Sequence, residues 1–385
     1  MVFPWLIQLF SVPLQPTSYY NMCQLHIFNP SHDEALAANS PYYYPAKAAR
    51  TLATDLAVLP AWWAEEGDWI LLPNETPLPP DDLSGRGVRF IHLNELKKLK
   101  DKQVEGIQPW GWDPLLVHQL TKAGADLALL PDVRQLEVVR ELSSRRSAVK
   151  VLQAVHQDLP DTVGTSYWCT DEKAVWNLLE ERESMMLKAP WSSSGRGVFA
   201  VGANPPESVR QRILRILQEQ GAIEAEPLYR RISDFALEFY AEGGQVEYRG
   251  LSVFATTDTG AYAGNIVGEE RSLLQRLPVE LREKLPEVVD ALCRHLHTLL
   301  ADHYEGPLGV DLMEVEKTDG KRGLHPCVEI NLRRTMGHVA LALGREMEKG
   351  HTGIYRLQPV GTPHEPQTRL LTPGAQKMEA VLISE

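Results

Sequence analysis

Residues Met185 to Val201, MMLKAPWSSSGRGVFAV, contain the pattern that decides the fold. Two short apolar runs flank the segment SSSGRG at 192–197, whose residues form turns and do not continue a strand. The pattern therefore predicts a strand, a loop of small residues and a second strand. Such a loop leaves backbone N–H groups free to surround an anion, and Lys188 and Arg196 add positive charge at its rim.

Taken alone, the same pattern equally fits a hairpin with an exposed loop of serine and glycine. The motif G-x-x-x-x-G-K-[ST], in which a phosphate loop joins a strand to a helix, occurs nowhere in the chain. A phosphate-binding function therefore needs support from a second stretch. If the loop does bind phosphates, the contacts come from Lys188 and from Ser192, Ser193, Ser194, Gly195, Arg196 and Gly197.

Two strand-like segments far downstream carry acids among apolar residues. They are GVDLMEV at 309–315 and VEINLR at 328–333, joined by a turn-prone segment. Glu329 and Asn331 are two residues apart on a strand and therefore share a face. Proteins usually hold Mg²⁺ with one or two carboxylates together with substrate phosphates. With Asp311, these residues form a candidate metal site.

The register between the two segments sets a condition on this site. A hairpin centred between Asp319 and Gly320 would place Asp311 opposite Val328, and Glu329 would then lie on the other face. A shared metal site therefore requires an odd-length loop or a β-bulge. The alternative is two unrelated acids on edge strands. A carboxylate inside an apolar strand, twice, in a chain with a candidate phosphate loop favours the metal site.

Together these stretches resemble the ATP-grasp superfamily, over roughly residues 142 to 345 and more weakly before that. Members have a lysine-bearing strand with a Gly/Ser phosphate loop, then G-(V/I)-D and E-(I/A)-N on late strands. The resemblance implies an α/β plus α+β fold, with a Rossmann-like N-terminal domain before two lobes that enclose ATP. The implied divisions are an N-terminal domain at 22–141, a small lobe with the phosphate loop at 142–222, and a large lobe with the hinge and metal site at 223–385.

The resemblance also implies roles for individual residues. Arg146, near the start of a helix, would reach the nucleotide phosphates, with Lys150 as a weaker candidate that equally fits a solvated basic face. The strand 222–228 and the residues that follow it would hold the nucleoside, and the candidates are Glu226, the backbone of Leu228 at the adenine, and Asp234 at the ribose. Asp234 also fits a turn residue.

The chemical step has two implied residues, Lys188 and Arg333. Many members have an arginine where Gly309 stands and a proline where Leu332 stands. We therefore expect Arg333 to stabilise the developing negative charge in place of the missing arginine.

Strands that alternate with helices near the N-terminus predict a parallel sheet, where ligands collect at the carboxyl ends of the strands. The loop after the first strand, 24–28, carries His32 and Asp33. These two residues, with Arg333, are candidates for binding the acceptor substrate, although helix capping fits His32 and Asp33 equally well. Residues 1–21 contain three prolines and no Lys or Arg, so we expect a disordered or mis-started extension before Met22.

The composition of the chain limits the kinds of binding partner and the cellular location that we expect. The net charge of −12 argues against a general nucleic-acid binder and against an anionic membrane surface. The four cysteines show no C-x-x-C spacing, which is typical of reduced thiols in a cytoplasmic protein. No apolar run has the length of a membrane span.

The resemblance implies a cytoplasmic ligase that uses ATP and Mg²⁺ (or Mn²⁺) to join a small-molecule carboxylate to an amine or a thiol through an acyl-phosphate. A homodimer is compatible with this function. Two alternatives stay open. One is a nucleotide-binding module without turnover, although both metal acids are present in this chain. The other is a small-molecule kinase, which shares the first half-reaction with the ligase.

Overall fold

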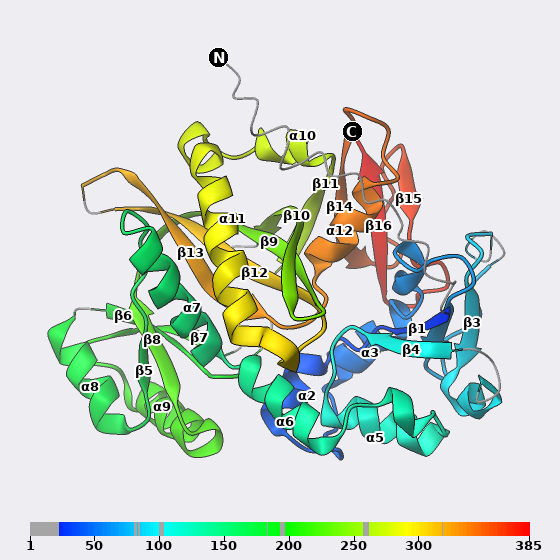
Figure 1. Ribbon diagram of the computed structural model, residues 1–385, viewed down its shortest axis with the longest axis horizontal. Helices are drawn as coiled ribbons and strands as arrows, with labels where there is room; N and C mark the ends of the chain where they lie inside the picture. The colour runs from blue at the N-terminus through cyan, green and yellow to red at the C-terminus, as the bar shows by residue number, and fades with distance from the viewer. Residues whose placement is uncertain are drawn as a thin grey trace.

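The computed structural model describes residues 23–80, 83, 85–99, 104–182, 184–192, 197–256, 262–317 and 319–385 (Figure 1). The expected extension at 1–21, with Met22, lies outside these residues. Four residues of the phosphate loop also lie outside them, namely Ser193, Ser194, Gly195 and Arg196. The described strands form three sheets.

The first sheet is parallel, in the order β3-β2-β1-β4, as the N-terminal pattern predicts. Its strands are β1 (Cys23–Ile27), β2 (Trp69–Leu72), β3 (Arg89–His92) and β4 (Val104–Pro109). The elements beside it are α2 (His32–Ala38), α3 (Lys47–Asp55), α5 (Pro114–Ala123) and the 3₁₀ helices η1 (Leu59–Trp62), η2 (Leu93–Leu99) and η3 (Leu127–Leu129). Most residues of β1 and β2 are apolar because connecting elements cover both faces of a parallel sheet.

Local sequence signals set the ends of several helices. Asp113 accepts a hydrogen bond of 2.9 Å from the backbone N–H of Leu116, and Pro114 occupies the first position of α5. Asp132 caps α6 (Val133–Leu142) and Ser144 caps α7 (Arg145–Asp158). Asp171 caps α8 (Glu172–Glu181), because its side chain accepts a hydrogen bond from the backbone N–H of Ala174.

The second sheet is antiparallel, in the order β5-β8-β6-β7. Its strands are β5 (Tyr167–Cys169), β6 (Ser184–Lys188), β7 (Val198–Gly202) and β8 (Ile223–Pro227), and α8 and α9 (Glu207–Gln220) pack on it. β6 and β7 pair from Ser184↔Gly202 to Lys188↔Val198. The predicted arrangement of strand, loop and strand is therefore confirmed, with the loop at the end of β6 that carries Lys188.

The third sheet is antiparallel, in the order β13-β12-β9-β10-β11-β14-β16-β15. Its strands are β9 (Arg230–Glu242), β10 (Gln245–Thr256), β11 (Tyr262–Gly268), β12 (Gly306–Glu316), β13 (Arg322–Asn331), β14 (Thr352–Pro359), β15 (Thr368–Leu370) and β16 (Met378–Ser384). The remaining helices are α10 (Glu270–Leu274), α11 (Val279–Leu300), α12 (Met336–Gly344) and the 3₁₀ helix η4 (Ala301–His303).

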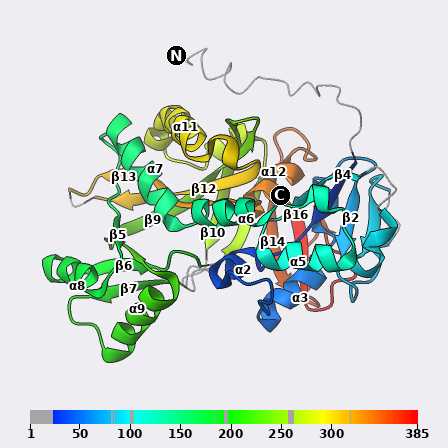
Figure 2. The ribbon, with the colours of Figure 1, turned by 60° about the horizontal axis from the view of Figure 1, so that its bottom comes forward.

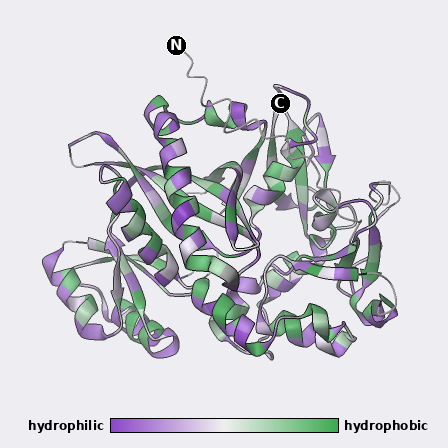
Figure 3. Cartoon of the chain, viewed as in Figure 1, coloured by the Kyte–Doolittle hydropathy of each residue, from purple (hydrophilic) through white to green (hydrophobic). Residues whose placement is uncertain are grey.

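The two faces of this sheet have different neighbours. Phe235, Leu237 and Phe239 of β9 point into a core shared with α7 and α11. Hydrophobic and hydrophilic residues alternate along α11, as expected of a helix with one face on a sheet (Figure 3). The alternate residues of β9, such as Glu238, lie on the opposite face, beside α12. That face carries the candidate metal acids.

The C-terminal strands pack against the N-terminal part of the chain. Trp62 donates a hydrogen bond of 2.8 Å from its indole Nε1 to the backbone oxygen of Leu371. The buried carboxylate of Asp55 accepts hydrogen bonds from the backbone N–H groups of residues 376–378. None of the described helices is long and apolar enough to cross a membrane. The expected domain boundaries stay a prediction.

Candidate active site

β12 and β13 bring Asp311 directly opposite Glu329. The loop between the strands, 317–321, has an odd number of residues, so the two acids fall on the same face. The pairing also shifts between Asp311 and Met313, where residues 326–328 lie opposite Leu312 alone. This irregularity contains Pro326, which has no N–H to offer the ladder. The structure therefore places Asp311 and Glu329 on one face of the sheet, as a shared metal site requires.

The two acids are half-buried, and no cation forms an ion pair with Asp311 within the described residues. Burial, together with the carboxylates of Glu329 and Glu238, raises the pKa of Asp311 to about 7 against the opposing effects of Asn331 and Arg333. Asn331 donates a hydrogen bond of 3.2 Å from Nδ2 to Asp311. Like charges this close favour a bound cation between them.

The donor set at this point suits Mg²⁺. Two carboxylates and an amide are hard oxygen ligands, and Mg²⁺ usually completes its shell with water and phosphate oxygens. No cluster of three or more His, Cys, Asp or Glu forms a ready metal cage anywhere in the described residues. The residues present therefore fit a cation that binds together with a phosphate ligand.

Lys188 lies at the end of β6 with 3% of its surface exposed. Its Nζ is 2.8 Å from the Glu226 carboxylate and 3.7 Å from that of Glu224, but it makes no well-aligned hydrogen bond within the described residues. Burial disfavours its charge, and the two carboxylates outweigh burial and raise the pKa of Lys188. The ammonium is therefore charged and still has donors to offer a phosphate.

Glu226, for which the resemblance implies a nucleoside contact, lies 2.8 Å from Lys188, and its role at the nucleoside stays a prediction. Burial opposes its ionisation, but Lys188 and His325 lower the pKa of Glu226 to about 2. Glu224 accepts a hydrogen bond of 2.7 Å from Ser166, and its burial raises its pKa. Both acids hold Lys188 in place from β8. Sequence reasoning missed Glu224, although its alternation with Glu226 on one strand puts both on one face.

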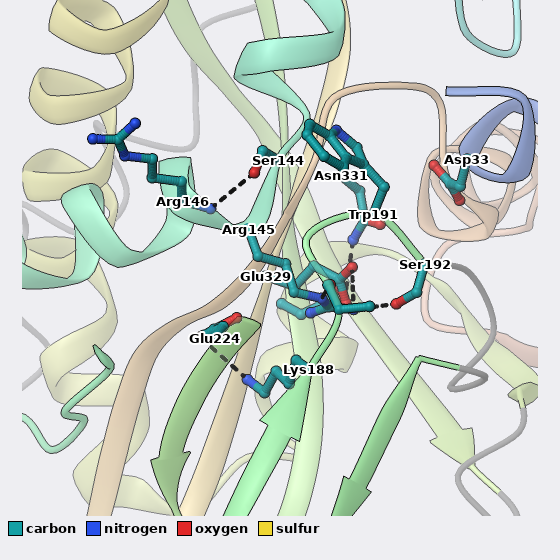
Figure 4. A network of polar contacts seen from close by, with 12 residues as sticks. Asp33, Ser144, Arg145, Arg146, Lys188, Trp191, Ser192, Glu224, Glu329 and Asn331 are labelled. Atoms are coloured by element: carbon teal, nitrogen blue, oxygen red, sulfur yellow. Dashed lines mark hydrogen bonds and ion pairs between the residues drawn. The ribbon is translucent and has the colours of Figure 1, made fainter. Parts of the chain in front are cut away.

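Arg145, the first residue of α7, turns into the site (Figure 4). It donates from Nε to the backbone oxygen of Ala189 at 3.1 Å and from Nη2 to Ser192 Oγ at 3.2 Å. Its Nη2 is also 2.8 Å from Glu329. The buried guanidinium of Arg145 thus connects the first residues of the phosphate loop to the candidate metal ligand Glu329.

Arg146, the residue expected from the resemblance, is exposed and points away from this network (Figure 4). The neighbouring candidate Lys150 is exposed too. A sequence signal for Arg145 exists: Ala148, Val149 and Leu152 follow it at i+3, i+4 and i+7, so Arg145 shares the apolar stripe of the helix. Of the two arginines, Arg145 makes the contacts of this network, whereas the phosphate contact of Arg146 stays a prediction.

Arg333 lies two residues beyond the end of β13 and reaches the N-terminal part of the chain. It donates from Nε to Asp33 at 2.9 Å, and its Nη2 lies 2.8 Å from the same carboxylate. Nη2 also donates to Asn331 Oδ1 at 3.0 Å. Asp33 therefore lies at the site. His32 does not, because its ring is buried beside Gly111, 3.5 Å from Asp113.

The expected nucleoside-binding residues lie farther along the same lobe. Leu228 follows β8 and is 47% exposed. Asp234 on β9 is 2.8 Å from Arg231, and burial raises its pKa. His325, which sequence reasoning missed, is fully buried 3.7 Å from Glu226 and packs edge-on against Tyr229.

A small polar hollow lies among these groups. Trp191, Ser192, Glu329, Asn331 and Asp33 are among the residues that line it. Of the residues expected to bind phosphate, Gly197 closes the loop, since its oxygen accepts a hydrogen bond of 2.9 Å from Ala189. The hollow thus lies between Glu329 and Asn331 of the candidate metal site, Ser192 of the phosphate loop and Asp33.

No protein-family model matches the chain, and no curated protein sequence matches it. Solved structures do. A biotin carboxylase complex from Campylobacter jejuni is 12% identical, with a TM-score of 0.56 over 94% of this chain and 87% of that one. The biotin carboxylase domain of a Hydrogenobacter thermophilus 2-oxoglutarate carboxylase is 12% identical, with a TM-score of 0.52 over 93% and 85%.

An N5-carboxyaminoimidazole synthetase from Staphylococcus aureus is also 12% identical, with a TM-score of 0.50 over 94% of this chain and 93% of that one. At this identity the likeness establishes the fold alone. It extends over the parallel sheet and both antiparallel sheets, in agreement with the fold that the sequence motifs predict. The chain has an ATP-grasp fold.

Proposed function

We propose that the protein is a ligase that uses ATP and Mg²⁺ to join a small-molecule carboxylate to an amine or a thiol through an acyl-phosphate. The similar structures support a nucleotide ligand, since they are described as complexes with an ATP compound, with ADP, and with MgADP and bicarbonate. The four cysteines are free thiols, which supports a cytoplasmic location.

The observation that carries this proposal is the direct opposition of Asp311 and Glu329 on the face that also holds Asn331. A nucleotide-binding module without turnover has no need to keep two carboxylates beside each other at a cost in stability. In our proposal Asp311, Glu329 and Asn331 hold Mg²⁺, which offsets negative charge on the phosphates when bound.

The chain's own cations complete the phosphate environment. Lys188 and Arg145 are both buried, and both lie at the root of the loop 192–197. Preorganised charges in a site with little water stabilise a developing anion more than the same charges in solution. In the proposal they orient the γ-phosphate for attack by the substrate carboxylate, and Ser192 and Gly197 position the loop.

Arg333 is the proposed partner of the substrate carboxylate. Its planar guanidinium already holds a carboxylate, that of Asp33, with two donors. Such a fork suits a second carboxylate or an acyl-phosphate equally well. The backbone of Leu228 and the side chain of Asp234 remain our candidates for the adenine and the ribose.

The test is a screen of carboxylic acids and amines in pairs with MgATP, in which ADP and free phosphate are measured separately. We expect a pair for which both products appear only when both partners are present. Formation of ADP without free phosphate would identify a kinase instead. Binding of ATP without turnover for any pair, in protein with intact metal acids, would contradict the ligase.

A further inference from the structure

A second cavity, with a volume of about 890 Å³, lies in the N-terminal part of the chain. It is bordered by the residues that follow β1 and β2, by α3 and α5, and by residues 376–377. Figure 2 shows α3 and α5 in this part of the fold. Small-molecule sites have volumes of roughly 300–1,000 Å³, and parallel sheets place them at the carboxyl ends of their strands. Lys188, Asp311, Glu329 and Arg333 do not line this cavity. It is therefore separate from the candidate active site.

Two exposed tyrosine rings line the cavity. Tyr42 and Tyr44 line it with exposures of 78% and 71%, which are large values for such side chains. The ring of Tyr42 contacts His118 edge-on, with 5.1 Å between centroids, and the guanidinium of Arg50 lies 4.4 Å from the Tyr44 ring. Tyr42 and Tyr44 therefore keep most of their surface open to a ligand.

Four cationic side chains line the cavity, those of Lys47, Arg50, Lys122 and Lys377, together with three carboxylates. Within the described residues, the side chains of Lys47, Lys122 and Lys377 make no hydrogen bond or ion pair. The carboxylate of Asp55 is already bound by backbone N–H groups at 376–378, and that of Asp113 by Leu116 and Asn29.

Glu75 is the remaining acid in the lining. In a chain with a net charge of −12, the lining of this cavity thus has one more cation than it has carboxylates, and three of its lysines are unpaired within the described residues. Local positive potential in a concave, low-dielectric surface concentrates anions.

We propose that this cavity binds a small organic anion, with a planar apolar body against Tyr42 and Tyr44 and a phosphate or carboxylate group near Lys47, Lys122 and Lys377. Planar groups stack well on tyrosine rings, and the lysines attract the anionic end. The inference goes beyond the proposed ligase, because it requires no turnover at the active site.

The test measures binding of four probes to the full chain by calorimetry and by ligand-observed NMR. Phenyl phosphate and phenylacetate combine a ring with an anion, whereas phenol and inorganic phosphate each lack one of these parts. We expect at least one of the combined probes to bind in the millimolar range or tighter, and both simple probes to bind more weakly. The preferred combined probe identifies the anionic group as phosphate or carboxylate.

Two sets of variants locate the probe. The triple variant Lys47→Gln, Lys122→Gln, Lys377→Gln should weaken binding about tenfold, because each exposed charge contact contributes about 0.2–1 kcal/mol. A matched triple variant at Lys173, Lys321 and Lys349 removes the same charge from exposed positions elsewhere and should leave binding unchanged.

The double variant Tyr42→Ser, Tyr44→Ser tests stacking apart from charge, and it should also weaken binding. Melting curves of all variants check the fold. Competition by a non-hydrolysable ATP analogue would place the probe in the nucleotide site and overturn the proposal. Equal loss in the two triple variants, or no saturable binding of either combined probe in the millimolar range, would overturn it too. None of these results depends on ligase activity.

Discussion

Arg333 and Asp33, 300 positions apart in the sequence, form a two-point ion pair at the edge of the candidate active site. The pair connects α2, beside the parallel sheet, to the end of β13 in the large antiparallel sheet. Because Arg333 also donates to Asn331, the position of a metal-site residue depends on a contact from the N-terminal part of the chain.

We predict that Asp33→Asn impairs use of the carboxylate substrate without weakening nucleotide binding. The amide keeps the shape of the side chain but loses the charge that orients Arg333. KM for the carboxylate should rise and affinity for an ATP analogue should not change. Loss of this partly buried, charged contact should also reduce the free energy of unfolding by about 1–3 kcal/mol, measured in urea.

A matched control for this change is Asp158→Asn, which removes an exposed pair with Arg294 far from the site. It should have a smaller effect on stability and none on KM. Equal kinetic effects of the two variants would contradict the role of Asp33.

The adjacent residues Arg145 and Arg146 offer a comparison within one helix turn. Arg145→Gln should reduce affinity for an ATP analogue roughly 10- to 100-fold, because one charge-assisted contact contributes about 1.5–3 kcal/mol. Arg146→Gln should leave affinity within error, since its side chain is exposed and points away from the site. Calorimetry on both variants tests this, and a larger loss with Arg146→Gln would reverse our assignment.

Lys188→Met should affect both nucleotide affinity and stability. We expect the free energy of unfolding to fall by about 3–5 kcal/mol, because Glu224 and Glu226 would then be buried without their cation. Adding Glu224→Gln to this variant should recover part of the stability but none of the affinity for the ATP analogue. Urea unfolding and calorimetry separate the two effects. Recovery of both would mean that Lys188 acts only through the fold.

Asp311→Asn should uncouple stability from turnover. Without metal, the variant should be at least as stable as the original protein, because repulsion from Glu329 is relieved. Turnover should fall about 100-fold or more, since a bound cation supplies several kcal/mol of charge stabilisation and each 1.36 kcal/mol is tenfold in rate. Stabilisation by MgADP in a melting curve should shrink as well.

Glu314→Gln is the control for this change. Glu314 lies on the same strand, β12, but bonds to Ser233 and Arg322 away from the site. This variant should lose stability and keep its activity per folded molecule. Full stabilisation of Asp311→Asn by MgADP would show that Asp311 is not a metal ligand.

Glu329, the other candidate metal acid, has a second partner besides Asp311. Glu329 is in fact 2.8 Å from the buried guanidinium of Arg145. Loss of its charge would leave that cation without its closest carboxylate, so the Asp311 variant gives the clearer test.

The features that the sequence determined by itself are local. Asp113 and Pro114 start α5 because capping involves neighbouring backbone groups alone. The strands on each side of the loop 192–197 follow from two apolar runs and a segment of turn residues. The ATP-grasp fold could be predicted because the lysine strand and the two late acids occur in a fixed order along the chain.

Tertiary structure alone decided which side chains meet. Asp311 faces Glu329 because an irregularity around Pro326 shifts the pairing of β12 with β13. No local propensity specifies how many residues such an irregularity contains. Arg145 points inward and Arg146 outward because α7 buries one stripe against the large sheet. The pairing of Asp33 with Arg333 required the N-terminal part to dock beside β13. Contacts between distant segments depend on how whole sheets pack, and a pattern read along the chain contains no such distances.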